Sequence, residues 1–169
     1  MKVHTVYIGL GSNMGDRVAF LREAVQRLGA IVTIEKASRL YVAAPLGYVR
    51  DDAFINAAVS GTTTLKPLEL LEMMQAIEQT MGRRPGVTFG PRLIDLDLLF
   101  YDAVQIETRK LTVPHPLIQQ RAFVLKPLAE IAPNLMHPVL YYTVSQLLQD
   151  AEDADQVQIY APEKHLAST

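Results

Sequence analysis

Residues 92–100 read Arg-Leu-Ile-Asp-Leu-Asp-Leu-Leu-Phe, and in the middle of this run two aspartates alternate with apolar residues. Alternation with a period of two is typical of a β-strand, in which residues two apart point to one face. Asp95 and Asp97 therefore share one face of a predicted strand over residues 93–100, with their Cα atoms about 7 Å apart. The opposite face carries residues expected to pack into a core: Ile94, Leu96 and Leu98.

Further strands and helices are predicted on both sides of this segment. Apolar and β-branched runs predict strands over residues 3–10, 31–42 and 54–64. Apolar residues at helical spacing predict helices over residues 16–28, 67–81, 121–131 and 144–150. The order β-α-β-β-α-β predicts an α+β fold, a ferredoxin-like sandwich with an antiparallel sheet, helices packed on the sheet and additional C-terminal helices.

Glycines cluster at the end of the first predicted strand and just beyond it, in Gly9-Leu-Gly11-Ser-Asn13-Met-Gly15. The spacing does not match the GxGxxG loop of dinucleotide-binding proteins, because position 14 is Met. We interpret the cluster as a tight turn between a strand and a helix, and phosphate binding is the alternative.

Length and composition restrict the class of protein. A chain of 169 residues suits one domain over residues 1–169, in which the acidic and then polar residues 151–169 are expected to be loosely ordered. A net charge of −2 argues against a nucleic-acid partner, and the absence of cysteine excludes disulfides and Cys-zinc sites. With no signal-peptide or membrane-span pattern, we expect a cytoplasmic protein with no membrane contact. We also expect a monomer rather than an oligomer.

The aspartate pair points to a divalent cation. Two carboxylates on one face of an apolar strand repel each other, and burying them unpaired is costly. Mg²⁺ commonly takes one or two carboxylates together with phosphate oxygens of a substrate. Solvated or arginine-paired aspartates are an equally good interpretation of Asp95 and Asp97 alone.

Cations flank the aspartate strand on predicted loops: Arg83, Arg84, Arg92, Lys110 and Arg121. Guanidinium groups bind phosphate oxygens with two parallel hydrogen bonds, and Mg²⁺ with such cations suits phosphoryl transfer. Each cation alone is better explained as scattered surface charge. His115 lies between two prolines, where it either donates to a phosphate or serves as a structural loop residue.

One polar residue and three aromatic residues suit a flat heterocycle. Asn56 lies in an otherwise apolar predicted strand, and its amide offers both a donor and an acceptor to the edge of a ring. Phe54, Phe89 and Phe123 lie near the predicted loops, where aromatic faces stack on rings. Core packing is the alternative for each of the three.

Taken together, these segments resemble the 6-hydroxymethyl-7,8-dihydropterin pyrophosphokinases of folate synthesis. The matching pieces run in the family's order: Gly9-Leu-Gly-Ser-Asn13, Pro45-Leu-Gly47, Phe54-Ile-Asn56-Ala-Ala58, Gln75-Ala-Ile-Glu78, Gly82-Arg83, Gly90-Pro-Arg-Leu-Ile-Asp-Leu-Asp97, Leu111-Thr-Val-Pro-His115, Arg121-Ala-Phe123 and Glu130-Ile-Ala-Pro133. The resemblance covers residues 9 to about 138, and its most specific piece is the one that ends at Asp97.

The resemblance implies transfer of a diphosphate from ATP to the hydroxymethyl group of the pterin, with release of AMP. By that analogy Asp95 and Asp97 hold two Mg²⁺ ions. The implied catalytic set is Arg83, Arg84, Arg92, Asp95, Asp97, His115 and Arg121. The implied ATP-binding set is Gln75, Glu78, Leu98, Lys110 and Thr112. The implied pterin-binding set is Ala44, Pro45, Leu46, Phe54, Asn56, Phe89 and Phe123.

The sequence departs from the family's usual pattern in the loop over residues 83–92. Thr88 stands where an Arg is common, Phe89 where Trp is frequent, and Arg84 directly follows Arg83; outside this loop, Lys110 replaces a frequent Arg. Two alternatives to an active enzyme follow. One is a paralogue that binds pterin or nucleotide with weak or no transfer. The other, a ferredoxin-like RNA-binding or sensor module, is disfavoured by the negative charge on the aspartate strand.

Overall fold

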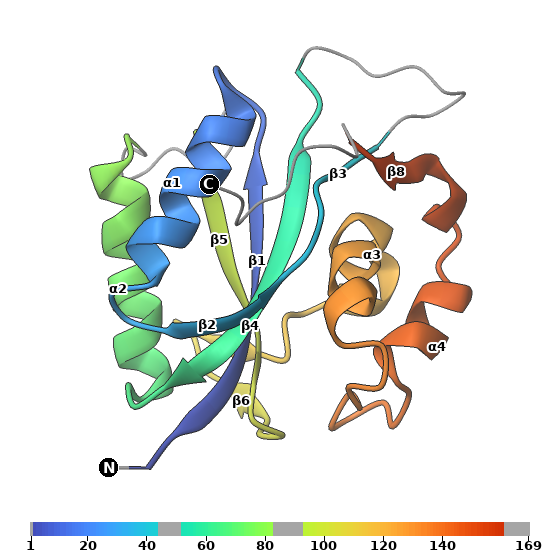
Figure 1. The fold of residues 1–169 in the computed structure, drawn as a ribbon. Coiled ribbons are helices and arrows are strands. Elements are labelled where there is room, and N and C mark those ends of the chain that lie inside the picture. The colour runs from blue at the N-terminus through green and yellow to red at the C-terminus, as the bar shows by residue number, and fades with distance from the viewer. Residues whose placement is uncertain (1, 44–51, 83–92, 161–169) are drawn as a thin grey trace.

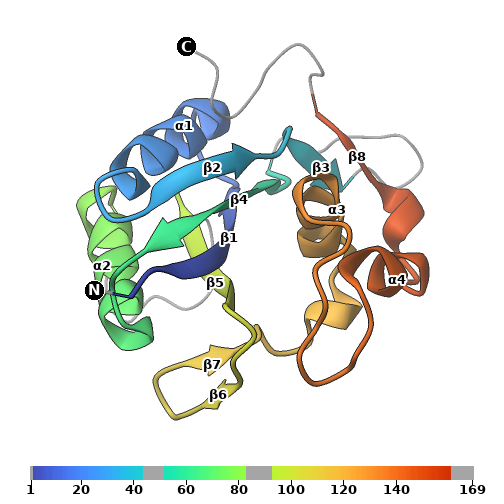
Figure 2. The ribbon, with the colours of Figure 1, turned by 60° about the horizontal axis from the view of Figure 1, so that its bottom comes forward.

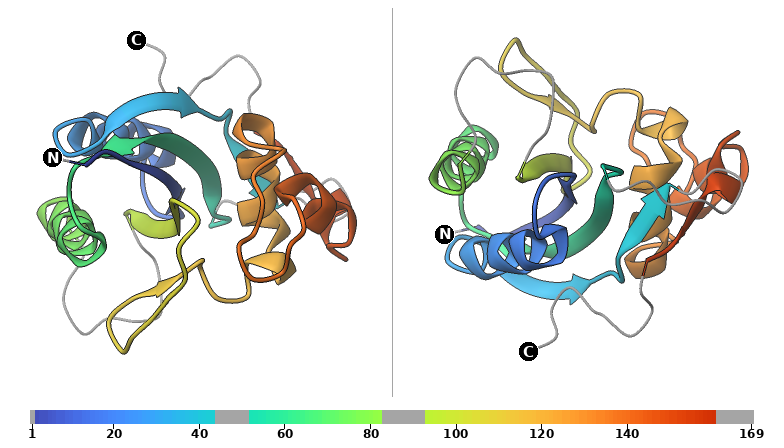
Figure 3. Two further views of the ribbon diagram at one scale, coloured as in Figure 1. Left: turned by 90° about the horizontal axis from the view of Figure 1, so that it is seen from below. Right: turned by 90° about the horizontal axis from the view of Figure 1, so that it is seen from above.

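The structure is a computed structural model that describes residues 2–43, 52–82 and 93–160. It has three layers: an antiparallel sheet stands between one pair of helices, α1 and α2, and a second pair, α3 and α4 (Figure 1; Figure 3). The strands are β1 (His4–Ser12), β2 (Thr33–Ala37), β3 (Tyr41–Ala43), β4 (Ile55–Thr63), β5 (Asp95–Tyr101), β6 (Ile106–Glu107), β7 (Thr112–Val113) and β8 (Val157–Ile159). The helices are α1 (Arg17–Leu28), α2 (Pro67–Thr80), α3 (Ala122–Ile131) and α4 (Val144–Gln149), with 3₁₀ turns η2 (Ile118–Gln120) and η3 (Ala154–Gln156).

The main sheet has the strand order β5-β1-β4-β3-β8, and β2 pairs with β4 on the same side as β3. Every pair in this sheet is antiparallel. Because β2 and β3 occupy the place of one interrupted strand, the first six predicted elements keep the β-α-β-β-α-β order. The predicted ferredoxin-like α+β fold is therefore confirmed.

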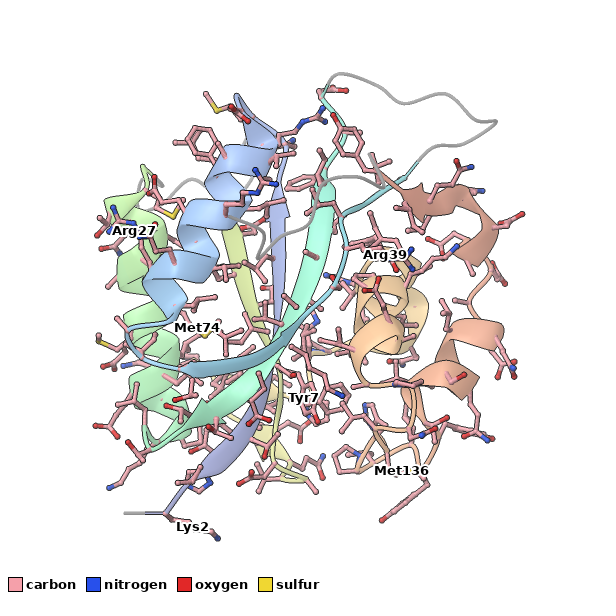
Figure 4. The ribbon with its side chains drawn as sticks, viewed as in Figure 1. Lys2, Tyr7, Arg27, Arg39, Met74 and Met136 are labelled. Atoms are coloured by element: carbon pink, nitrogen blue, oxygen red, sulfur yellow. The ribbon has the colours of Figure 1, made fainter. Side chains whose placement is uncertain are left out.

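Both faces of the sheet are buried, each against its own pair of helices. Alternate residues of β1, β4 and β5 pack against α1 and α2, where Met74 points toward the sheet (Figure 4). The next residues along these strands, among them Ala58, Leu99 and Phe100, pack against α3 and α4. The β1–β5 register shifts between Tyr7 and Ile8, so Leu99 and Phe100 both serve this second core.

Local sequence explains where the helices begin. Asp16 caps α1 by accepting a hydrogen bond from the Ala19 N–H at 3.1 Å. Pro67 occupies the first turn of α2, where its missing N–H leaves no hydrogen bond broken. Thr143 and Gln146 cap α4 reciprocally through each other's backbone N–H groups. None of the helices in the described ranges is long and apolar enough to span a bilayer.

Three predictions from the sequence need correction. Gly9 and Gly11 lie inside β1 rather than in a turn, which is confined to the residues after Ser12. The strand predicted over residues 31–42 breaks between β2 and β3, where the Ser38 hydroxyl accepts a hydrogen bond from the Ala58 N–H. The chain after Ala151 does not fray over residues 154–159, because η3 leads into β8, which pairs with β3.

The segment after β5 forms a small hairpin of β6 and β7 that projects from the end of the sheet (Figure 2). It returns the chain to β5, where the His115 N–H donates to the Leu99 carbonyl at 3.0 Å. From there η2 leads directly into α3. This path brings His115 and the first turn of α3 to the face of the sheet that carries the two aspartates.

Candidate functional site

A cavity of about 370 Å³ lies between the sheet and the first turn of α3. It is lined by residues of β1, β3, β4 and β5, of the chain entering β4, and of α3: Gly9, Leu10, Gly11, Ala43, Ala53, Phe54, Asn56, Ala57, Asp95, Asp97, Arg121, Phe123 and Val124. Six of the residues singled out from the sequence therefore meet at one cavity: Phe54, Asn56, Asp95, Asp97, Arg121 and Phe123.

Strand register explains why the carboxylates and the amide share this cavity. Asp95 of β5 pairs with Gly11 of β1, and Gly11 pairs in turn with Asn56 of β4. Residues paired across an antiparallel ladder point to the same face of the sheet. Asp95 and Asn56 therefore stand on either side of a glycine, which leaves bare backbone between them. Two residues further along β5, Asp97 pairs in the same way with Gly9 of β1.

The two aspartates form an anionic pair at the cavity wall. The Asp97 side chain is half exposed, and Asp95 is partly buried. Within the described ranges, no group of three or more acidic or histidine side chains is arranged to hold a metal ion. Two carboxylates beside an open cavity nevertheless fit Mg²⁺, since this ion commonly completes its octahedron with water and substrate phosphate oxygens.

His115 lies close to Asp97, with 3.9 Å between His115 Nε2 and Asp97 Oδ1. Its side chain is largely buried, and the burial lowers the pKa of the imidazole; the Asp97 charge opposes this effect and the Arg121 charge adds to it. A neutral imidazole retains one N–H, which is a donor suited to a phosphate oxygen.

The first turn of α3 supplies the cavity's cation and one of its rings. Arg121 is the N-cap of α3, and Phe123 lies in its first turn. Phe54 lies immediately before β4, so the two rings come from different layers of the molecule. The Asn56 side chain is nine-tenths buried and, among the described residues, forms no hydrogen bond. The arrangement can hold a flat polar ring between two aromatic faces and an anion beside Arg121.

Six predicted residues of the described ranges do not line this cavity: Gln75, Glu78, Leu98, Lys110, Thr112 and His115, which lies beside Asp97. Glu78 is buried, and its carboxylate accepts a hydrogen bond from the Leu96 N–H at 2.8 Å, so it also ties α2 to β5. Leu98 is buried in the core that faces α1 and α2. Thr112 lines a second cavity with His115, and Gln75 and Lys110 are exposed. Seven others lie outside the described residues: Ala44, Pro45, Leu46, Arg83, Arg84, Phe89 and Arg92.

Two features of the site were missed in the sequence. Gly11 was predicted to lie in a turn, but it lies in β1. Two glycines two residues apart at the end of an apolar run could have indicated a stretch of strand without side chains on one face. The second feature joins α3 to the chain before and within β3, since Glu130 accepts hydrogen bonds from the Tyr41 hydroxyl and from Arg39. No local pattern could have revealed this contact, because its partners lie about 90 residues apart.

Known proteins resemble this chain in sequence and in fold. Residues 7–133 match the family described as 7,8-dihydro-6-hydroxymethylpterin-pyrophosphokinase (HPPK). The chain is 50% identical over 127 residues to the 2-amino-4-hydroxy-6-hydroxymethyldihydropteridine pyrophosphokinase of Bacillus subtilis, covering 74% of this chain and 76% of the relative. It is 41% identical over 135 residues to the protein of the same name from Aquifex aeolicus, covering 80% and 84%.

A solved structure of wild-type HPPK-DHPS from Plasmodium falciparum, with pterin and p-hydroxybenzoate, has a TM-score of 0.72 to this structure. The two are 17% identical, and the match covers 94% of this chain and 46% of that chain. With 17% sequence identity, the structural similarity establishes a shared fold and nothing about function. The chain thus spans about half the length of that solved protein.

Proposed function

This chain belongs to the 7,8-dihydro-6-hydroxymethylpterin-pyrophosphokinase family, and from that membership we infer that it is an ATP-dependent diphosphokinase of folate synthesis. It transfers a diphosphate from ATP to the hydroxymethyl group of 6-hydroxymethyl-7,8-dihydropterin. The hydroxymethyl oxygen bonds to the β-phosphorus, the bond between that phosphorus and the α,β-bridging oxygen breaks, and AMP leaves. The hydroxyl proton passes to solvent.

The observation that carries the site assignment is the shared cavity. Two carboxylates, an arginine, two phenyl rings and the Asn56 amide line it together. A substrate pair that joins a polyphosphate to a flat heterocycle needs both kinds of group next to each other. Phosphoryl transfer needs little covalent chemistry from the protein. Much of the rate acceleration then comes from aligning the two substrates and neutralising the phosphate charge.

We assign the pterin to the half of the cavity formed by Phe54, Asn56 and Phe123. The two rings stack on the faces of the heterocycle, and the Asn56 amide donates to and accepts from its edge. Phe89 and residues 44–46, from the resemblance, complete this group. The Asn56 amide lines the cavity, and its donor and acceptor can pair with the edge of a ring there, which supports the assignment.

We assign the triphosphate to the part of the cavity lined by Asp95, Asp97 and Arg121, and to His115 next to it, whose Nε2 lies 3.9 Å from Asp97 Oδ1. Arg121 donates to phosphate oxygens, and neutral His115 donates one further hydrogen bond. Asp95 and Asp97 would hold two Mg²⁺ ions, which neutralise phosphate charge when bound. Arg83, Arg84, Arg92 and Lys110 add cations in this proposal, and Gln75, Glu78, Leu98 and Thr112 surround the nucleoside. We further propose a single pyrophosphokinase domain over residues 1–169 that acts as a cytoplasmic monomer, with no nucleic-acid partner.

A product assay tests the function. Purified protein is mixed with Mg²⁺, ATP and 6-hydroxymethyl-7,8-dihydropterin, and the nucleotides are separated. AMP that forms only when the pterin is present supports diphosphate transfer. ADP would contradict the mechanism, and pterin binding without AMP would favour the paralogue without transfer.

The variant Asp97→Asn tests the metal assignment. It keeps the shape of the side chain but removes a hard anionic ligand, so we expect turnover to fall by at least about a hundredfold, the scale of losing about 2.7 kcal/mol of transition-state stabilisation. Asp150→Asn, at the exposed end of α4, is the matched control and should leave turnover unchanged. An Asp97→Asn rate near that of the wild type would refute the metal assignment.

A further inference from the structure

Gly11 occupies the floor of the cavity between the two halves of the proposed site. It is buried, and it pairs with Asp95 on one side and with Asn56 on the other. Its backbone does not require glycine, because the positive φ values among the described glycines are those of Gly15 and Gly82. The reason for a glycine at this position must therefore be the space above it.

A side chain at Gly11 would collide with particular neighbours. A Cβ built there lies 2.9 Å from Asn56 Oδ1 and 3.3 Å from Phe54 Cδ1. The three nearest side-chain atoms all belong to Asn56 and Phe54, and none to Asp95. A methyl group at Gly11 would thus displace the Asn56 amide and the Phe54 ring, which belong to the proposed pterin half. It would not contact the Asp95 carboxylate.

Gly9 provides a comparison within the same strand and on the same face. A Cβ built at Gly9 meets its nearest atoms, all from the Leu99 side chain, at 3.4 Å or more, which is ordinary van der Waals contact. Gly9 pairs with Asp97, so it stands beside the other carboxylate. The two glycines therefore differ in one respect that matters here, which is whether a methyl group would displace Asn56 and Phe54.

We propose that Gly11 is a positioning residue for the pterin: its missing side chain lets the Asn56 amide and the Phe54 ring occupy the places from which they contact the heterocycle. The proposal rests on the proposed function, since it assumes that the ligand of this half is the dihydropterin. It adds a determinant of pterin affinity that is separate from ATP binding. Gly11 acts through its two neighbours and needs no contact with the substrate.

The variant Gly11→Ala should separate the two substrates. We expect the KM for the pterin to rise about tenfold or more, which is the scale of about 1.4 kcal/mol, while the KM for ATP stays within about twofold. Gly9→Ala is the comparison within the strand, and its KM for the pterin should rise by much less than that of Gly11→Ala, because a Cβ at Gly9 meets only the Leu99 side chain. Equal behaviour of the two variants, or equal rises of both KM values in Gly11→Ala, would overturn the proposal.

A double-mutant cycle with Asn56→Ala tests whether Gly11 acts through the amide. Asn56→Ala removes Oδ1, so adding Gly11→Ala to it should reduce pterin binding by much less than in the wild-type background. Pterin binding is measured by calorimetry with Mg²⁺ and a non-hydrolysable ATP analogue present. Additive losses would contradict the coupling. If Gly11→Ala alone fails to fold and the double variant folds, the collision with Asn56 is demonstrated directly.

An NMR measurement of the Asn56 side-chain amide signals tests the role of Gly11 without any substrate. Its result can therefore be separated from a failure of the proposed function. Gly11→Ala should shift these signals in the protein without substrates, and Gly9→Ala should not. A wild-type protein that binds no pterin would refute the assigned substrate, whatever the amide signals show. Wild-type pterin binding with unshifted Asn56 signals in Gly11→Ala would refute the role of Gly11 alone.

Discussion

His137 is a histidine that the fold holds in its neutral form. It is buried, and its Nδ1 accepts hydrogen bonds from the Val139 N–H at 3.2 Å and the Leu140 N–H at 3.1 Å. Its ring packs edge-on against Phe100, with 5.8 Å between the centroids. Burial lowers the pKa of His137, because the charged form loses its hydration. A proton on Nδ1 would also break both hydrogen bonds.

This histidine makes stability depend on pH. The unfolded chain takes up a proton near pH 6.5, whereas the folded chain does so at a lower pH. The stabilisation is therefore complete above about pH 6.5 and is lost as the pH falls below it, with a slope of up to about 1.4 kcal/mol per pH unit. His137→Asn retains an acceptor oxygen but does not titrate, so we expect a smaller loss of unfolding free energy between pH 7.5 and pH 5.5.

Urea denaturation at both pH values measures this difference. Part of the pH dependence should remain in His137→Asn, because burial also lowers the pKa of His115. Asp102 is a useful contrast: burial raises its pKa, but hydrogen bonds from His4 and from the Thr5 N–H outweigh this and lower it overall. Its contribution is therefore lost only at more acidic pH. An unchanged slope in His137→Asn would contradict the assignment.

At the scale of secondary structure, Glu130 connects α3 to the strand edge that borders the cavity. Its carboxylate accepts hydrogen bonds from the Arg39 N–H, the Arg39 guanidinium and the Tyr41 hydroxyl. Burial and the Glu130 carboxylate raise the pKa of Tyr41 to about 12, so its hydroxyl is a donor at neutral pH. Tyr41 pairs with Asn56 across β3 and β4. Glu130 therefore helps to fix the helix that carries Phe123 relative to the strand that carries Asn56.

Removal of this carboxylate should cost more stability than removal of a solvated one. Glu130→Ala leaves the largely buried Tyr41 hydroxyl without its acceptor, so we expect a loss of about 1–3 kcal/mol in unfolding free energy. Glu23→Ala is the control, since Glu23 pairs with Arg27 on the exposed face of α1, and should change stability by no more than about 0.5 kcal/mol. Chemical denaturation at neutral pH compares the two, and equal losses would refute the role of Glu130.

The sequence predicts features that depend on one segment, but not those that depend on how distant segments pair. The period of two over residues 93–100 predicted the shared face of Asp95 and Asp97, because side-chain alternation within one strand is a local property. The row from Asp95 through Gly11 to Asn56 depends on register between three strands, and no single segment encodes that register. The break at Ser38 and the contacts of Glu130 arise for the same reason from partners distant in sequence.

At the scale of the whole molecule, the chain after α4 returns to the cavity. β8 adds a strand to the sheet beside β3, and Val157 pairs with Ala43, which lines the cavity. Lys126 of α3 donates hydrogen bonds to the carbonyls of Ala154 and Val157. The acidic and polar composition of this segment predicted loose order. That prediction was wrong because the contacts that order the segment come from β3 and α3, which its composition does not reveal.

Tyr160 extends this support to the chain that enters β4. The Arg17 guanidinium lies over the Tyr160 ring, 5.7 Å from its centroid, and also donates to the Ala53 carbonyl at 2.6 Å. Ala53 directly precedes Phe54, one of the two proposed stacking rings. The C-terminal segment thus braces both the β3 edge and the entry to β4, although Tyr160 itself is not among the lining residues.

A chain that ends at Asp150 should therefore bind pterin poorly. Compared with a chain that ends at Tyr160, it lacks buried Val157 and the pairing with β3, so we expect a loss of about 2 kcal/mol or more in unfolding free energy. The KM for the pterin should rise further than the KM for ATP, because Ala43 and Phe54 border the pterin half. Thermal unfolding and steady-state kinetics of the two chains test this. Equal pterin KM values in both folded chains would show that the segment stabilises the fold without shaping the site.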